Sequence, residues 1–469
     1  MNIEQIYTGC LAQGAYYIES QGEVAIIDPL REVQPYLDRV KKDGAKVKYI
    51  FETHFHADFV SGHLTLSKET GAPIVYGPNA NPDFDVVVAK DGQEFLLGEI
   101  TLVALHTPGH TMESTTYLLR DKDGKDHAIF SGDTLFLGDV GRPDLAQKAN
   151  TITQEDLAGY LFDSLRNKIM PLADDVIVYP AHGAGSACGK NMMKETVDSL
   201  GNQKKMNYAL RADMSKEEFI QEVTDGLLPP PSYFPLNVKM NKSGYDDIDK
   251  VLARGTRALD PAAFEQVANA EGALILDVRH QNDFVLGHIP QSIFIGIDGG
   301  FAPWVGALIA DVKQPILLVA PEGREEETIT RLSRVGFDNT LGYLEGSFAA
   351  WKAAGKEYDS ISGVNAEGLE QAIKNKDAIV FDVRKEGEFL SEHIQGAQHA
   401  PLDYLNEHLN DFPEQGTFYV HCAGGDRSVI AASLLKKRGI HNLTDVKGGF
   451  KAIKETAIPV TDYVCPSTL

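Results

Sequence analysis

The first half of the chain consists of short apolar runs that each end in polar residues. A β-branched and aromatic run at 47–51 predicts a buried strand that opens into a polar loop at 53–59. Further strands are predicted at 24–28, 102–106, 129–132 and 176–181, and helices at 35–40, 61–70 and 154–169. Strands interrupted by helices over residues 1 to about 225 indicate a layered α/β domain.

The second half of the chain is a duplication. The proline-rich segment 226–235 cannot continue a helix or lie in a central strand, so it marks the exit from the first domain. Beyond it, the segment 275–279 recurs at 380–384 with the same Asp-Val-Arg ending, and 345–348 matches 447–450. We therefore predict three domains, at 1–245, 246–358 and 359–469.

Composition limits the possible partners and location. At about 150 residues per domain, 469 residues agree with three domains, and 43% hydrophobic with 24% charged residues is typical of a globular protein. A net charge of −23 without a Lys/Arg-rich run argues against nucleic acid and membrane as partners. The chain shows neither a signal sequence nor an apolar run of membrane-spanning length, so we expect a cytoplasmic protein. We also expect the protein to form a homo-oligomer.

The four cysteines, Cys10, Cys188, Cys422 and Cys465, are widely spaced and include no CxxC pair. A disulfide framework is therefore not expected.

Four predicted strands in the first domain are followed by potential metal ligands. Histidines at i and i+2 with a carboxylate two further on can converge on a cation, and His/Asp groups after strands mark sites. The residues concerned are His54, His56 and Asp58 after the first of these strands, then His110, Asp133 and His182 after the others. The sequence thus predicts a metal site at one edge of the domain.

This ligand pattern resembles the metallo-β-lactamase fold superfamily and, within it, the persulfide dioxygenases. The resemblance implies an αββα sandwich. Hydrolases of the superfamily such as glyoxalase II carry a His after the Asp, which helps to build a second metal site, whereas this chain has Phe59 there.

The resemblance therefore implies one Fe(II) per chain, held by His54, His110 and Asp133. His56, Asp58 and His182 would then lie outside the primary coordination shell. Because sequence does not fix the metal, a zinc-dependent thioester hydrolase of the glyoxalase II kind is the alternative.

Two further segments bear on the substrate. In persulfide dioxygenases a GRxD segment follows the metal aspartate, so the resemblance implies that Arg142 binds a carboxylate or phosphate of the carrier thiol. The alternative is an ion pair of Arg142 with Asp144 or Asp139 that only shapes the loop.

The glycine-rich segment 182–190, ahead of a helix predicted at 191–200, departs from glutathione-using persulfide dioxygenases and resembles bacterial fusions with rhodaneses. Its N–H groups could bind the phosphate of a coenzyme A persulfide. A flexible turn in which Cys188 packs is the alternative, so both glutathione and coenzyme A type persulfides stay open.

The duplicated units resemble rhodanese sulfurtransferases, whose domain is a parallel sheet flanked by helices. Asp277 with Arg279, and Asp382 with Arg384, are then structural pairs at strand ends. In the second unit a predicted strand at 418–421 leads into a loop opened by Cys422 and an apolar helix at 429–435.

Backbone N–H groups of such a loop and the helix dipole stabilise a thiolate and cradle a terminal sulfur. We therefore predict Cys422 as the nucleophile, with Gly424, Gly425 and Arg427 binding substrate. The first unit lacks a cysteine in this loop, so we expect a spacer or docking domain.

Taken together, these features predict a fusion enzyme of sulfide metabolism. An iron dioxygenase would oxidise a small-molecule persulfide to sulfite with O2, and a rhodanese would exchange sulfur between thiosulfate, sulfite and thiols. A zinc hydrolase with an appended sulfurtransferase is disfavoured by Phe59, and a non-enzymatic sulfur-relay adaptor by the complete ligand set.

Overall fold

The computed structural model describes residues 1–147, 151–375 and 378–465. The chain forms two compact units, Met1–Ile248 with Leu332–Gly336, and Asp249–Arg331 with Phe337–Leu469. Among the described residues, no helix is both long and apolar enough to cross a membrane.

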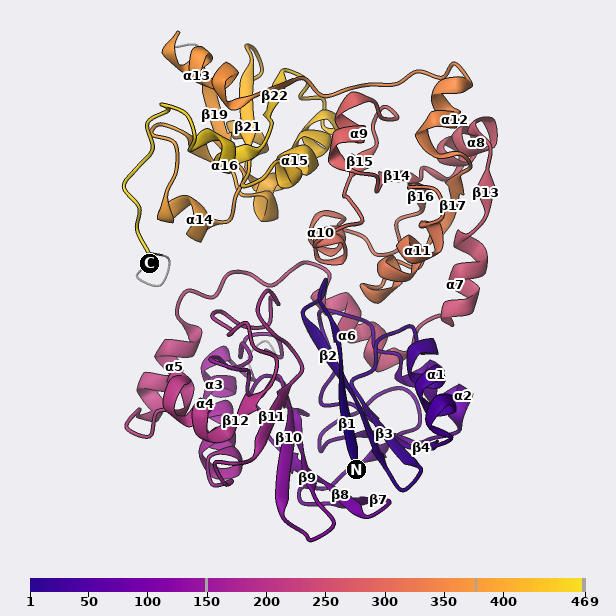
Figure 1. Ribbon diagram of the computed structural model, residues 1–469, viewed down its shortest axis with the longest axis vertical. Coiled ribbons are helices and arrows are strands. Elements are labelled where there is room, and N and C mark those ends of the chain that lie inside the picture. The colour runs from indigo at the N-terminus through magenta and orange to yellow at the C-terminus, as the bar shows by residue number, and fades with distance from the viewer. Residues whose placement is uncertain (148–150, 376–377, 466–469) are drawn as a thin grey trace. The chain divides into compact units, whose positions relative to one another are not determined.

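The first unit contains two six-stranded sheets (Figure 1). In the first sheet the order is β1 (Asn2–Thr8), β2 (Gln13–Ser20), β3 (Glu23–Ile27), β4 (Lys46–Phe51), β5 (Ile74–Tyr76) and β6 (Val87–Val88). In the second it is β12 (Asp198–Ser199), β11 (Ile177–Pro180), β10 (Asp126–Gly132), β9 (Thr115–Arg120), β8 (Ile100–His106) and β7 (Glu94–Leu97). Strands β3 to β6 run parallel, as do β10 and β11, and the remaining neighbours are antiparallel.

Alternating side chains explain why the two sheets stack as a sandwich. On β2, Tyr16 and Ile18 face the second sheet and share one core with Tyr117 and Phe130. Their neighbours on β2 point the other way, into a core beneath α1 (Gln34–Asp43) and α2 (His63–Thr70). A third core joins the outer face of the second sheet to α3 (Gln154–Ser164), α4 (Leu200–Met206) and α5 (Lys216–Thr224). The predicted αββα architecture is therefore confirmed.

Two predicted helices differ from those in the structure. The segment 154–169 begins as α3 behind a Thr153 and Asp156 capping box but finishes as a π-helical turn, Leu165–Ile169. The helix predicted at 191–200 is wrong, because none of the described residues 191–199 is helical and α4 begins only after the Ser199 cap. Asp139 Oδ2 accepts from the N–H groups of Lys190 and Asn191, which fixes this segment as a loop. A phosphate site at a helix N-terminus here therefore has no structural basis.

The chain leaves the sandwich through α6 (Phe234–Ser243) and α7 (Ile248–Gly255). Pro235 lies in the first turn of α6, where a missing N–H costs nothing.

The second unit holds two five-stranded sheets with the same strand order, all parallel (Figure 1). The first has β13 (Ala258–Leu259), β17 (Thr340–Leu344), β16 (Ile316–Val319), β14 (Leu274–Asp277) and β15 (Ile293–Phe294). The second has β18 (Gly363–Val364), β22 (Leu443–Val446), β21 (Phe418–His421), β19 (Ile379–Asp382) and β20 (Gln398–His399). The duplication seen in the sequence is thus a duplication of fold.

Helices flank each of these sheets. In the first they are α8 (Pro261–Glu271), α9 (Gln281–Leu286), α10 (Phe301–Leu308), α11 (Glu325–Arg334) and α12 (Ser347–Ala353). In the second they are α13 (Ala366–Lys374), α14 (Glu386–Ser391), the 3-10 turns Leu402–Glu407 and Leu409–Asp411, α15 (Asp426–Lys437) and α16 (Gly449–Ile453). All residues from Ser428 to Leu435 of α15 are buried, and Ser433 Oγ accepts from the Phe294 N–H of edge strand β15 at 3.0 Å. Strand β15 of the first copy thus helps to bury the helix that follows Cys422.

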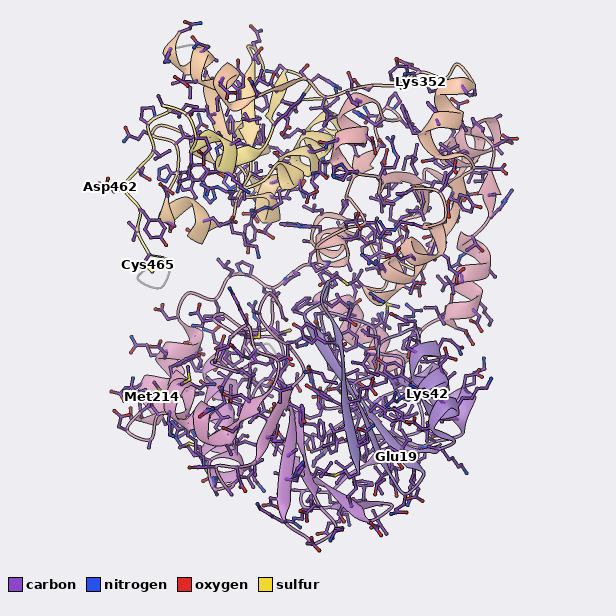
Figure 2. All side chains as sticks on the ribbon, viewed as in Figure 1. Glu19, Lys42, Met214, Lys352, Asp462 and Cys465 are labelled. Atoms are coloured by element: carbon purple, nitrogen blue, oxygen red, sulfur yellow. The ribbon has the colours of Figure 1, made fainter. Side chains whose placement is uncertain are left out.

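Charged side chains such as Lys42 at the end of α1 and Lys352 of α12 are exposed, as is Cys465 (Figure 2).

Candidate functional sites

Three strand ends of the sandwich bring His54, His110 and Asp133 together. The residues follow β4, β8 and β10, and their ligand atoms all lie within 4.8 Å of one another. Asp133 Oδ2 is 3.8 Å from His54 Nε2 and 3.4 Å from His110 Nε2. Within the described part of the chain, neither oxygen of buried Asp133 has a hydrogen-bond partner. Since an uncompensated buried carboxylate is costly, this donor set fits a bound cation.

Hydrogen bonds behind the two histidines direct their Nε2 atoms toward Asp133. His54 Nδ1 lies 3.0 Å from Thr53 Oγ1, which donates to Asp28 Oδ2 at 2.8 Å. His110 Nδ1 lies 2.8 Å from the carbonyl oxygen of Arg142. Such partners fix the tautomer of a metal-binding imidazole. Burial and the neighbouring histidines lower the pKa of His54 well below its ordinary value, so the ring is neutral, as a metal ligand must be.

His56, Asp58 and His182 form a second buried group beside the first. His182 Nε2 lies 3.4 Å from Asp58 and 3.6 Å from Asp133. His56 Nε2 instead lies 3.1 Å from Asp28 and 3.5 Å from Glu52. Burial lowers the pKa of His56, but these carboxylates outweigh it and raise that pKa to about 9. The Phe59 ring is centred 4.3 Å from the His56 ring.

Sequence reasoning missed several polar residues of this region. Asp28 closes β3 and Glu52 directly precedes Thr53, so the same strand-end rule that found the histidines applied to both. Glu52 accepts from Ser61 Oγ and lies 3.4 Å from His63 Nδ1. Asn241 of α6 donates to the carbonyls of His56 and Phe59 at 2.8 Å each, and no local pattern indicates that contact.

Cys188 and Arg142 lie close to the metal-ligand group. Cys188 groups with Asp133 and His182, and burial, with both nearby aspartates, raises the pKa of its thiol well above the ordinary value. The Arg142 guanidinium donates to both oxygens of Asp144 at 2.7 Å and to the carbonyls of Ala187 and Leu228. The structure therefore shows the Asp144 pair that the sequence left open as the alternative to substrate binding.

In the second rhodanese-like copy, Cys422 directly follows β21 and is buried. Its Sγ accepts from the Gly425 N–H at 3.1 Å, and Gly425 adopts a φ of 107° as the N-terminal cap of α15. A side chain at 425 would be strained in this conformation. Arg427 forms a two-fold hydrogen bond with Glu388 of α14, at 2.6 and 2.9 Å.

The Asp-Val-Arg segments of both copies form the predicted structural pairs. Arg279 Nη2 lies 2.6 Å from Asp277, and Arg384 Nη2 lies 2.6 Å from Asp382. Each arginine also donates to a backbone carbonyl and covers a phenylalanine ring.

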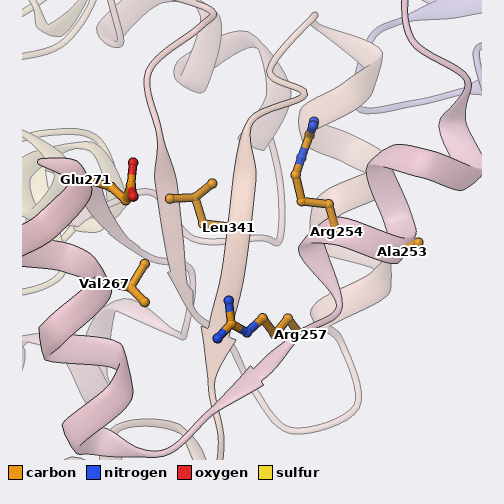
Figure 3. A pocket seen from close by; sticks show the side chains of 6 residues that line it. All are labelled: Ala253, Arg254, Arg257, Val267, Glu271 and Leu341. Carbon is orange, nitrogen blue, oxygen red and sulfur yellow. The ribbon is translucent and has the colours of Figure 1, made fainter.

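The first copy has Ala320 after β16 where the second has Cys422 after β21. The nearby Arg324 pairs with Asp298 and Glu327. A hollow in this copy is lined by Ala253, Arg254, Arg257, Val267, Glu271 and Leu341 (Figure 3). Its lining contains no cysteine, serine or histidine to act as a nucleophile or base.

Comparison with known proteins agrees with this architecture. The model of the metallo-beta-lactamase superfamily matches residues 8–182, and that of the rhodanese-like domain matches 260–354 and 365–456. The human protein named "Persulfide dioxygenase ETHE1, mitochondrial" is 29% identical over 222 residues, which are 47% of this chain and 78% of the relative. An Arabidopsis thaliana cytoplasmic hydroxyacylglutathione hydrolase is 33% identical over 138 residues, or 28% of this chain and about half (53%) of that relative.

A crystal structure of a metallo-beta-lactamase from Staphylococcus aureus is similar over 73% of this chain and 98% of its own, with 28% identity and a TM-score of 0.64. The chain therefore contains a metallo-β-lactamase domain, which two rhodanese-like domains follow.

Proposed function

We propose that this chain is a non-haem iron persulfide dioxygenase joined to a rhodanese sulfurtransferase. In the first activity, one low-molecular-weight persulfide, one O2 and one water give the thiol and sulfite. The observation that carries the proposal is the buried triad His54, His110 and Asp133, in which two imidazole nitrogens face one uncompensated carboxylate. Two histidines and one carboxylate are typical of non-haem Fe(II) oxygenases. The similarity to a persulfide dioxygenase supports the same assignment.

Fe(II) held by this triad would supply open coordination positions for dioxygen and for the persulfide sulfur. The chain's own residues keep the triad in place. Thr53 and the Arg142 carbonyl hold the two imidazoles by their Nδ1 atoms. The buried rings of Phe59 and Phe136, centred 6.4 and 6.1 Å from the His182 ring, give one side of the site an apolar lining.

In the second activity, Cys422 would carry the sulfur. Its thiolate attacks the sulfane sulfur of a donor, the bond to the donor breaks, and the donor leaves as a thiolate or as sulfite. An acceptor thiol or sulfite then takes the outer sulfur from the Cys422 persulfide, with thiosulfate as product when the acceptor is sulfite. The Gly425 N–H, which already donates to Sγ, is placed to stabilise the thiolate.

A zinc-dependent thioester hydrolase is the second candidate for the first domain. Two observations favour it: His182 lies 3.4 Å from Asp58 and 3.6 Å from Asp133, and Cys188 groups with Asp133 and His182 as one more potential ligand. The similarity to a hydroxyacylglutathione hydrolase points the same way. Against it stands Phe59, which removes the histidine that a second metal would use.

Metal analysis with an oxygen-electrode assay separates the two candidates. We expect one iron per chain and oxygen uptake that depends on a glutathione or coenzyme A persulfide. Two metals per chain, or zinc that supports turnover of a thioester, would contradict the proposal. In addition, His110→Ala should abolish oxygen uptake and leave sulfurtransferase activity in the folded protein.

A further inference from the structure

Arg427, the cation in the loop that Cys422 opens, is paired with the carboxylate of Glu388. Arg427 Nη1 lies 2.6 Å from Glu388 Oε2 and Nη2 lies 2.9 Å from Oε1, which uses the guanidinium fork in its strongest geometry. The side chains are 18% and 37% exposed, so the pair is only partly screened by water. Arg427 follows the Gly425 cap, whose N–H donates to Cys422 Sγ, and it interacts electrostatically with Cys422.

Further carboxylates surround the same arginine. Asp403 and Asp426 both interact with Arg427, and burial raises the pKa of each of them. Lys385 also faces Asp403. Asp382 acts on Arg427 and Arg384 acts on Glu388 as well, so the Arg427–Glu388 pair lies in a network of opposite charges in which the arginine is already paired.

Thiosulfate and sulfite, the anionic substrates of the proposed sulfurtransferase, bind more strongly where a cation near Cys422 is free to pair with them. In this geometry an anion can use the Nη1/Nη2 edge of Arg427 only if it displaces the Glu388 carboxylate, and an anion on the other N–H groups still meets the negative charge of Glu388 beside it. A persulfide whose charges lie far from its sulfur has no such requirement, because only its sulfane sulfur has to reach Cys422.

We propose that Glu388 is a specificity-determining residue that weakens the binding of small sulfur oxyanions at Cys422 and thereby favours thiol persulfides. The choice of substrates in this proposal rests on the proposed function. The anion-binding step itself depends only on Arg427, Glu388 and the Cys422 loop.

The substitution Glu388→Gln isolates the charge of this residue. Glu388 Oε2 also accepts from the Lys385 N–H at 3.1 Å in the capping box of α14, and a glutamine oxygen preserves that cap. Glu386, exposed in the first turn of the same helix, provides the matched control Glu386→Gln. Glu388→Asp keeps the charge but shortens the side chain, so the two-fold bond to Arg427 is lost.

The test measures alkylation of Cys422 by iodoacetamide in the full chain, by peptide mass spectrometry, with increasing sulfate at constant ionic strength. Sulfate resembles thiosulfate in shape and charge but transfers no sulfur. We expect the half-protecting sulfate concentration to fall about five- to tenfold in Glu388→Gln, to fall less in Glu388→Asp, and to stay unchanged in Glu386→Gln.

Equal protection of the wild type and Glu388→Gln would overturn the proposal, as would a lack of protection in Glu388→Gln at any sulfate concentration. If protection follows the expected order but wild-type protein transfers no sulfur, the sulfurtransferase assignment fails while the role of Glu388 stands.

Discussion

Gly141 lies where a single added methyl group would displace two predicted metal ligands. A Cβ there would lie 2.1 Å from the carbonyl oxygen of Asp133 and 3.0 Å from Nδ1 of His110. The Gly141 N–H also donates to that Asp133 carbonyl at 3.0 Å, so the backbone cannot move away without losing this bond. Real Cβ contacts are not found at such distances. Gly141→Ala must therefore shift the backbone of Asp133, the His110 ring, or both.

The cost follows from these contacts. Overpacking a buried position costs about 1–3 kcal/mol of unfolding free energy. Disturbed ligand orientation lowers metal affinity by about 10–100-fold. We therefore expect Gly141→Ala to bind iron substoichiometrically at micromolar metal and to lose most persulfide-dependent oxygen uptake, while the Cys422 sulfurtransferase reaction is retained.

Metal content by mass spectrometry and oxygen uptake at several iron concentrations check this expectation. Gly9→Ala is the matched control, since a Cβ there meets nothing within 4 Å and the residue has no positive φ. If Gly141→Ala matched that control in metal content and oxygen uptake, the assignment of His110 and Asp133 as ligands would be refuted.

Three further predictions concern other parts of the chain. Thr53→Val removes the hydroxyl between His54 and Asp28, so iron affinity should fall about 10–100-fold in an iron titration. The control Thr53→Ser keeps the hydroxyl and should bind iron about as well as the wild type. Equal iron affinities of Thr53→Val and the wild type would exclude a role for the hydroxyl. Burial raises the pKa of Asp445 from 3.8 to about 6. The carboxyl is therefore harder to ionise in the folded state, and stability is lost as pH rises through this range, by up to about 3 kcal/mol. Asp445→Asn should accordingly be the more stable protein at pH 7.5 and equal to wild type below pH 4 in thermal unfolding, whereas a stability gain that did not change with pH would contradict burial of the charge. Supplied with persulfide and O2, the intact enzyme should yield thiosulfate alongside sulfite, whereas the Cys422→Ser variant should yield sulfite alone. Ion chromatography measures both products, and thiosulfate from the variant would mean that Cys422 does not couple the two sites.

The sequence was informative where function depends on strand ends. An apolar run fixes where a strand stops, and strands that stop at one edge bring their next residues together, as they do for His54, His110 and Asp133. The duplication was visible for a related reason, because each sheet has the Asp-Val-Arg segment at the end of the corresponding strand, β14 in the first sheet and β19 in the second. Element boundaries were less predictable where long-range contacts decide them, as when Asp139 fixes the backbone at 190–191.

Contacts between side chains distant in sequence were not predictable. The Asn241 amide donates to the backbone of the loop at 53–59 from a helix more than 180 positions away. Glu388 accepts from Arg427, which lies 39 positions away. No periodicity or local motif records such pairs. Arg427 was predicted to bind substrate because its chemistry suits an anion, and no local pattern indicates that a carboxylate already holds its guanidinium.

The two rhodanese-like copies separate what the fold requires from what the chemistry requires. Both keep an arginine paired to a strand-end aspartate, and both align the next strand identically: Asp277 pairs with Val319 and Asp382 with His421. The residues that follow these partners differ, since Ala320 stands where Cys422 does.

A second difference lies beneath the loop. In the first copy Tyr343 pairs with Leu318, and at the same position of the second copy the buried Asp445 pairs with Val420. The features that both copies share thus belong to the sheet. Cys422 and the buried Asp445 stand only in the second copy, where the first has Ala320 and Tyr343. Burial of a carboxylate costs folding free energy, so Asp445 is hard to explain by stability alone. Its presence in the copy that also has the cysteine supports placing the sulfur chemistry at Cys422 rather than in both copies.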